Sequence, residues 1–183
     1  MNERVVGAAA AGWVTWARSG LDASAAVFRA EWICGERYDV LPFHGYLSSL
    51  PEFTEPIVGS WLGSVGERVV VVDASWLDVD VERLSHWSTS DDKAEPSVWS
   101  LPATPGALCW CVDEMPFNSW IAASTSRDSV LLSSRWEHFA LVSRIRMFDA
   151  AVVRGVRERF VHDVRSHPYA DEFDLVLRAY GLA

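Results

Sequence analysis

The sequence predicts an α+β protein with an N-terminal helical hairpin, a central and mainly antiparallel sheet, and two C-terminal helices. Three patterns indicate this plan: helical spacing of apolar residues before residue 36, four short apolar runs within residues 107–142, and helical spacing again after Asp149. Half of the 183 residues are hydrophobic, which is enough to form a buried core. We therefore expect one globular domain over residues 1–183.

Two helices are predicted at the N-terminus. The first, over residues 3–18, has apolar side chains three and four residues apart and is followed by Gly20. The second, over residues 23–36, has Asp22 at its N-cap position, where a short carboxylate can accept from the free amides of the first turn. Together the two helices would form a hairpin.

The next segment combines helix-breaking and apolar residues. Prolines and glycines interrupt residues 41–66 and exclude a long regular element. The same segment contains eight large apolar side chains between Phe43 and Leu62, too many for an unstructured linker. We expect an ordered segment with one or two short helical turns over the sheet, and ordered loops of this kind often line a site.

The sequence of residues 67–101 predicts two strands separated by an acidic loop. Four consecutive valines in residues 67–73 indicate a strand buried on both faces. Residues 77–84 fit either an alternating strand or a short helix capped by Asp80, and we favour the helix. Residues 88–97 are polar and acidic, which predicts an exposed loop, and residues 98–101 form a short strand.

The strongest fold prediction concerns residues 107–142. Four apolar runs of about four to six residues are separated by segments rich in Pro, Asn, Ser and Asp, which is typical of consecutive strands joined by turns. The sequence therefore predicts a four-strand antiparallel meander. After it, Asp149 can cap a helix that ends by Pro168, and a last helix is expected over residues 169–180.

Charge and cysteine content limit the partners and the compartment. The formal net charge of −9 repels nucleic acid and anionic lipid and would attract a basic protein. Fifteen arginines against the single Lys93 suggest the codon bias of a GC-rich bacterial genome. No run is apolar enough for a membrane span, and Cys34, Cys109 and Cys111 are expected to be reduced core residues of a cytoplasmic protein.

Motifs for catalysis or for cofactor binding are not evident. The sequence around Ser60 lacks the order of a nucleophile elbow, the histidines and cysteines lack metal-ligand spacing, and no glycine-rich phosphate loop is present. We expect no metal and no cofactor, and a binding role rather than an enzymatic one.

Ten tryptophans and an acidic stretch favour a protein-binding surface. Large aromatic anchors beside carboxylates are typical of a surface that receives a basic partner. The first hypothesis is therefore an immunity or inhibitor-type protein that neutralises a basic toxin or effector. Its predicted partner-binding residues are Trp76, Asp78, Asp80, Trp87, Asp91, Asp92 and Trp99.

The alternative is a small-molecule-binding domain or enzyme with a pocket between the meander and the helices. The polar residues predicted for that pocket are His44, Tyr46, Asp113, Glu114, Arg135 and His138. A homo-oligomer that buries its aromatics at a symmetric interface is a third hypothesis. Arginines from 144 to 165 could form a basic stripe, but a solvated helix face explains them better than nucleic-acid binding.

Overall fold

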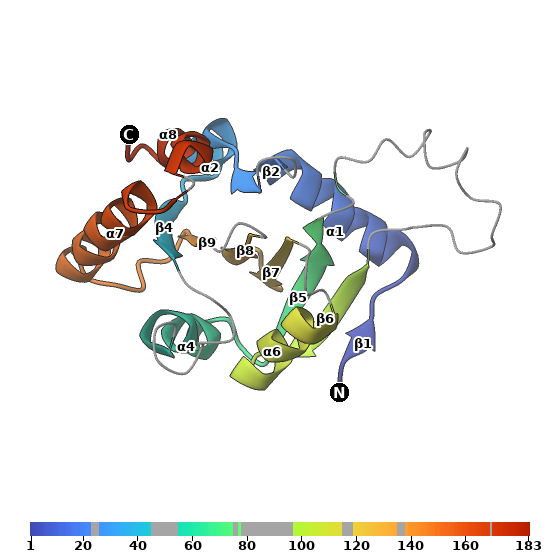
Figure 1. Cartoon of the computed structure of the whole chain (residues 1–183). Helices are drawn as coiled ribbons and strands as arrows, with labels where there is room; N and C mark the ends of the chain where they lie inside the picture. Colours follow the sequence, from blue (N-terminus) through green and yellow to red (C-terminus); the bar gives the residue numbers. More distant parts are fainter. Residues whose placement is uncertain are drawn as a thin grey trace, which may run out of the picture.

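A computed structural model describes residues 1–22, 26–44, 55–74, 77, 97–114, 119–134, 138–168 and 170–183. Within these residues, seven strands form one antiparallel sheet in the order β1-β6-β5-β7-β8-β9-β4, so the predicted α+β class is confirmed (Figure 1). The strands are β1 (Glu3–Arg4), β4 (Asp39–His44), β5 (Arg68–Asp73), β6 (Val98–Pro102), β7 (Trp120–Ser124), β8 (Ser129–Ser133) and β9 (His138–Ser143).

The sheet is apolar on both faces. Successive side chains of a strand point to opposite sides, and in the central strands both sets of side chains are apolar and buried. In β5, Val70 and Val72 belong to the buried cluster on one face, and Val69 and Val71 to the cluster on the other. Strands β7, β8 and β9 divide their residues between the two clusters in the same way. Both faces must therefore be covered by helices.

The helices cover both faces. Figure 1 shows α1 (Gly7–Gly20), α2 (Ala30–Glu36) and α8 (Asp174–Ala179) above the sheet, and α4 (Glu55–Ser64) and α6 (Pro105–Glu114) below it. Helix α7 (Ala150–Arg165) lies beside β4, at the edge of the sheet. Phe160 and Val164 of α7 join the cluster on the α1 side, whereas Val153 and Val156 pack against the other cluster. Helix α7 thus crosses the edge strand from one face of the sheet to the other.

The predicted N-terminal helices are both present but shorter than expected. Residues 3–4 form strand β1. In the described part of the predicted helix over residues 23–36, residues 27–28 form a strand and α2 begins at Ala30. A two-stranded hairpin of β2 (Leu21–Asp22) and β3 (Val27–Phe28) precedes α2. Gly20 at the end of α1 is required by close packing, since a Cβ there would lie 2.5 Å from the Trp32 ring.

A cluster of aromatic rings fixes α1 and α2 on the sheet. Trp32 lies 5.9 Å from Trp16 and 4.8 Å from Tyr38, measured between ring centroids. The guanidinium of Arg127, in the β7–β8 turn, lies 4.5 Å from the Trp13 ring centroid and 5.3 Å from that of Trp16. Tyr38 donates a hydrogen bond to the Arg127 carbonyl, and burial raises the pKa of Tyr38 to about 12, so the donor proton is retained at neutral pH.

The predicted first strand of the meander is wrong. Residues 105–114 form helix α6, and the meander consists of the three strands β7, β8 and β9. Thr104 Oγ1 accepts a hydrogen bond from the Ala107 amide at 3.3 Å, and Pro105 occupies the first helical position. Both features stabilise a helix start, so this apolar run is helical rather than extended.

The predictions for residues 41–101 are confirmed in part. The strands predicted over residues 67–73 and 98–101 are confirmed as β5 and β6, and the helical turn predicted within residues 41–66 is α4. Residues 41–44 belong instead to strand β4, which the prediction missed. Residues 45–54 and 78–96, which include most of the predicted acidic loop, lie outside the described part of the chain.

The C-terminal predictions are confirmed. The Asp149 carboxylate accepts hydrogen bonds from the Ala151 and Val152 amides, at 2.8 and 2.9 Å, and so caps α7. Helix α7 ends at Arg165, and a 3₁₀ turn (Ala170–Phe173) leads into α8. Among the described helices, none has both the length and the hydrophobicity that crossing a membrane would require.

Strand β4 is an edge strand whose free side is protected by α7. Arg157 Nε and Nη2 both donate to the Val40 carbonyl, at 3.1 and 2.6 Å. Pro42, two residues along, has no amide proton and therefore offers no donor at that edge. The two features leave little free hydrogen-bonding capacity for another strand to pair with.

We predict that Arg157→Met lowers the free energy of unfolding by about 1 kcal/mol, because the Val40 carbonyl loses its donors while the apolar stem is kept. Arg157→Lys should lose about half as much, since a single ammonium replaces the two-pronged guanidinium. Urea denaturation measures the change, with the same dependence of the unfolding free energy on urea concentration in the wild type and the variants.

The control for this prediction is Arg154→Met, one turn earlier on α7. Arg154 has no hydrogen bond or ion pair to any described residue, so its replacement should change stability by less than about 0.5 kcal/mol. Equal stabilities of the Arg157→Met and Arg154→Met variants would contradict the edge-closing role of Arg157.

Candidate functional site

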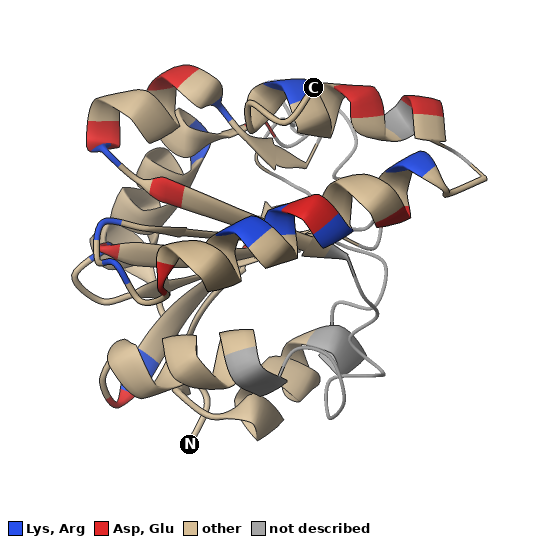
Figure 2. Cartoon of the chain, turned by 90° about the vertical axis from the view of Figure 1, so that its left-hand side faces the viewer, with Lys and Arg blue, Asp and Glu red and all other residues tan. Residues whose placement is uncertain are grey.

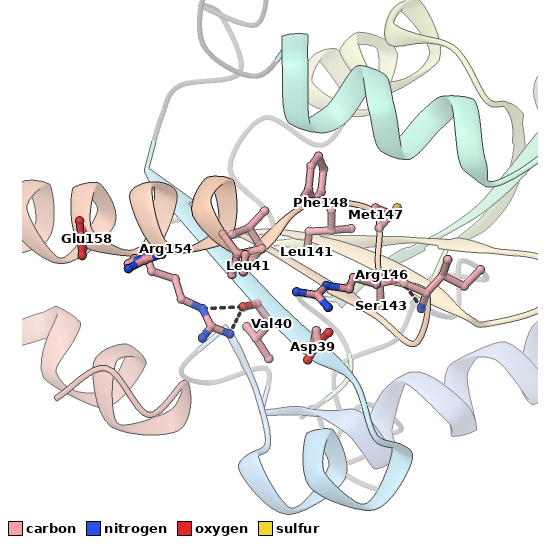
Figure 3. A pocket seen from close by; sticks show the side chains of 14 residues that line it. Asp39, Val40, Leu41, Leu141, Ser143, Arg146, Met147, Phe148, Arg154 and Glu158 are labelled. Atoms are coloured by element: carbon pink, nitrogen blue, oxygen red, sulfur yellow. Dashed lines mark hydrogen bonds between the residues drawn. The ribbon is translucent and has the colours of Figure 1, made fainter.

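A groove of about 550 Å³ lies where α7 crosses β4 and β9. Its walls come from two parts of the chain that are distant in sequence: β4, and the continuous segment that runs from the end of β9 through the following loop into the first half of α7 (Figure 3). The volume is within the range of sites for small organic molecules. This groove is the candidate functional site.

The floor of the groove is apolar. Leu41 of β4 is paired with Leu141 of β9, and the two side chains lie on the same face of the sheet. Val153 of α7 and the loop residues Met147 and Phe148 pack against the same buried cluster. Figure 3 shows Leu41, Leu141 and Phe148 grouped in the centre of the groove. A ligand with an apolar body would bury it here.

The rim of the groove is charged. Arg154, Arg157 and Glu158 line it from α7. Arg157 and Glu158 follow Arg154 by three and four residues, which places all three on the side of the helix that carries Val153. Arg146 comes from the loop before α7, and Asp39 from the start of β4. Figure 3 shows the Arg146 side chain extending across the groove toward Asp39. The rim therefore carries three guanidinium groups and two carboxylates.

The loop that carries Arg146 is held in place by its neighbours. The Arg144 amide donates to the Asp128 carbonyl at 2.8 Å, and the Arg144 side chain forms ion pairs with Glu36 and Asp128. The Ile145 amide donates to Ser143 Oγ at 3.0 Å. Together with the Asp149 cap, these bonds fix both ends of the loop, so this wall of the groove is preorganised.

The polar lining of the groove is mainly charged. It consists of three arginines, two carboxylates and Ser143, whose hydroxyl is bonded to the Ile145 backbone. Among the described residues that line it, Asp39 and Glu158 are the side chains that could accept a proton, and no histidine, cysteine or lysine is present. In the part of the chain that the structure describes, no group of three His, Cys, Asp or Glu side chains is arranged to hold a metal ion.

Of the six polar pocket residues predicted from sequence, His138 is the one whose side chain the structure describes, and it does not line this groove. His138 lies in β9 but is fully buried, with its ring 6.4 Å from Phe160 and 6.2 Å from Phe173, so it belongs to the core. His44 is paired with His138 in the sheet register, and Asp113 and Glu114 end helix α6; their side chains lie outside the described atoms. Tyr46 and Arg135 lie outside the described residues.

The predicted partner-binding patch lies largely outside the described chain. This applies to Trp76, Asp78, Asp80, Trp87, Asp91 and Asp92. Trp99 is described, is half-buried in β6, and packs edge-to-face on Trp110 at 5.1 Å. Trp61 of α4 is fully buried and donates to Ser129 Oγ at 2.9 Å. The seven described tryptophans are all buried or half-buried.

The cysteine predictions need correction. Cys109 and Cys111 are on helix α6, where two residues apart means different sides: Cys109 is exposed and Cys111 is buried. Cys34, predicted to be in the core, is exposed on α2. All three are free thiols. Burial raises the pKa of the Cys111 thiol to about 12, which keeps it protonated and unreactive.

The groove residues were partly visible in the sequence. The arginines at 146, 154 and 157 stood out as members of a basic stripe, which was interpreted as a solvated helix face. The structure divides that stripe: these three line the groove, whereas Arg144 and Arg159 are ion-paired to Glu36 and Asp163. Apolar residues at 150 and 153 beside arginines at 154 and 157 were the available sign that this helix face is not simply solvated.

Comparisons with protein-family models, curated proteins and solved structures found no match to this chain. The function proposed below therefore rests on the geometry of the groove and on the sequence.

Proposed function

We propose that this protein is a small-molecule-binding domain whose ligand occupies the groove between α7 and the β4–β9 edge. The observation that carries the proposal is a formed groove of about 550 Å³ with an apolar floor and a charged rim. The proposal develops the alternative drawn from the sequence, a pocket between the meander and the helices.

Apolar contact would supply most of the affinity. The apolar surface open to a ligand belongs to the half-buried Met147, Phe148 and Val153, since Leu41 and Leu141 beneath them are only 5% and 2% exposed. The charged rim would then orient the ligand, since charged groups discriminate among ligands more than they add affinity.

We predict that the neutral fluorescent probe N-phenyl-1-naphthylamine binds in the groove, and that Ala150→Trp blocks it. Ala150 lines the groove and is exposed at the start of α7, so an indole there fills the cavity without disturbing the core. The wild-type Kd should be about 0.1 mM or tighter, from about 0.3 kcal/mol per non-hydrogen atom. Ala150→Trp should weaken binding at least about tenfold, a cost of about 1.4 kcal/mol. Fluorescence on titration with protein measures both values.

The matched control is Ala151→Trp, at the adjacent and equally exposed position, which does not line the groove. It adds the same indole and should leave the Kd unchanged. The proposal fails if the wild-type protein does not bind the probe, or if the two tryptophan variants bind it equally.

A second candidate function is protein binding, which the net charge of −9 and the acidic stretch over residues 78–95 favour. Under this proposal the protein is a cytoplasmic immunity or inhibitor-type protein that covers a basic toxin or effector. Complementary charge would give fast association, and exposed tryptophans would slow release. Because the described tryptophans are packed in the fold, the anchors would have to be among Trp76, Trp87 and Trp136.

We predict that the protein used as bait captures one basic protein at low salt and releases it at high salt, because screening weakens a charged interface. Trp87→Ala and Asp91→Ala should each reduce capture, and the bait should inhibit the activity of the captured protein. Asp171→Ala, which removes an exposed carboxylate from the C-terminal 3₁₀ turn, serves as the charge control and should capture normally. Capture that is insensitive to Trp87→Ala and Asp91→Ala, or no capture, would rule out this candidate.

A further inference from the structure

We propose that the groove ligand is a small organic anion with an apolar body and one acidic group, of the carboxylate or sulfonate type. The inference rests on the proposed small-molecule function and specifies its ligand class. It depends on three features of the rim: arginines without internal partners, an excess of cationic groups, and their position next to an apolar floor.

The first feature is that two rim arginines lack partners. Among the described residues, neither Arg146 nor Arg154 forms a hydrogen bond or an ion pair. Neighbouring arginines behave differently: Arg144 is paired with Glu36 and Asp128, and Arg159 lies 3.7 Å from the Asp163 carboxylate. The guanidinium groups of Arg146 and Arg154 thus keep their full set of donors for a ligand.

The second feature is the balance of charge. The rim carries Arg146, Arg154 and Arg157 against Asp39 and Glu158, so it has one more positive group than negative groups. Arg157 is committed through Nε and Nη2 to the Val40 carbonyl, which leaves its charge at the rim but fixes its position. Figure 2, which views the molecule from the α7 side, shows both signs of charge interspersed along this helix. Because Arg157 is bonded to the Val40 carbonyl, an anionic ligand would be attracted most strongly to the part of the rim that Arg146 and Arg154 line.

The third feature is that the charged rim lies directly beside the apolar floor. Val153 on the floor and Arg154 on the rim are adjacent in α7, and Met147 follows Arg146 directly in the loop. A ligand whose acidic group meets a guanidinium therefore has its remaining atoms over Leu41, Leu141 and Phe148. This arrangement selects an amphipathic molecule over a purely polar anion such as inorganic phosphate.

The net charge of the chain limits how much charge the ligand can carry. At −9 the protein as a whole repels anions, and the repulsion increases with each added negative charge. A polyphosphate or a nucleic acid would meet this repulsion several times over, and in the groove Arg146 and Arg154 are the arginines that no described residue pairs with. A singly charged acid meets it once. The rim thus favours one acidic group.

The test compares two probes with the same ring system. 8-Anilino-1-naphthalenesulfonate carries one sulfonate, and N-phenyl-1-naphthylamine is its neutral counterpart. We expect the full-length protein to bind the sulfonate more tightly than the neutral probe. Arg146→Ala and Arg154→Ala should each weaken sulfonate binding about three- to fivefold and leave neutral binding unchanged, as expected for exposed ion pairs. Thermal unfolding of each variant verifies that it is folded.

Arg165→Ala is the charge control, because Arg165 ends α7, is exposed and lies away from the groove. It changes the net charge by the same amount and should leave both affinities unaltered. Equal affinity of the wild-type protein for the two probes, or equal effects of Arg146→Ala and Arg165→Ala, would overturn the anion proposal while the groove remains a binding site. Failure of both probes to bind would overturn the proposed function itself.

Discussion

The two apolar faces of the central sheet are the constraint on which the rest of the fold depends. Because β5 and β7 to β9 place buried side chains on both sides, the sheet needs helices above and below it. Helices α1, α2 and α8 cover one face, and α4 and α6 cover the other (Figure 1). The chain leaves the meander at Ser143 and must still reach the α1 side to place α8. Helix α7 makes this passage around the β4 edge.

The groove is a consequence of how α7 passes that edge. A helix cannot continue the hydrogen-bonded ladder of a sheet, so α7 closes β4 through one side chain, with Arg157 on the Val40 carbonyl. The first half of α7 and the loop residues 145–148 border the groove beside this contact. The same contact therefore protects an edge strand and positions the arginine-lined rim beside an apolar floor.

The sequence was informative where one pattern had one structural meaning. Consecutive valines in β5 and the helical spacing after Asp149 predicted the correct elements. Residues 107–112 were assigned wrongly because a short apolar run fits a strand or a helix, and the Thr104–Pro105 start was overlooked. Strand β4 was missed because Pro42 was taken to exclude regular structure, although an edge strand tolerates proline. The groove could not be predicted, since it joins Asp39 and Leu41 to residues 100 or more positions later.

The central claim is that the α7 groove is where this protein binds its ligand, and NMR titration of the uniformly ¹⁵N-labelled chain with 8-anilino-1-naphthalenesulfonate tests it most directly. The account predicts amide shift changes confined to residues 39–41 and 141–158, with the arginine Nε signals of the rim among those that move. Changes centred instead on the aromatic cluster of α1 and α2, with the groove amides unmoved, would contradict it.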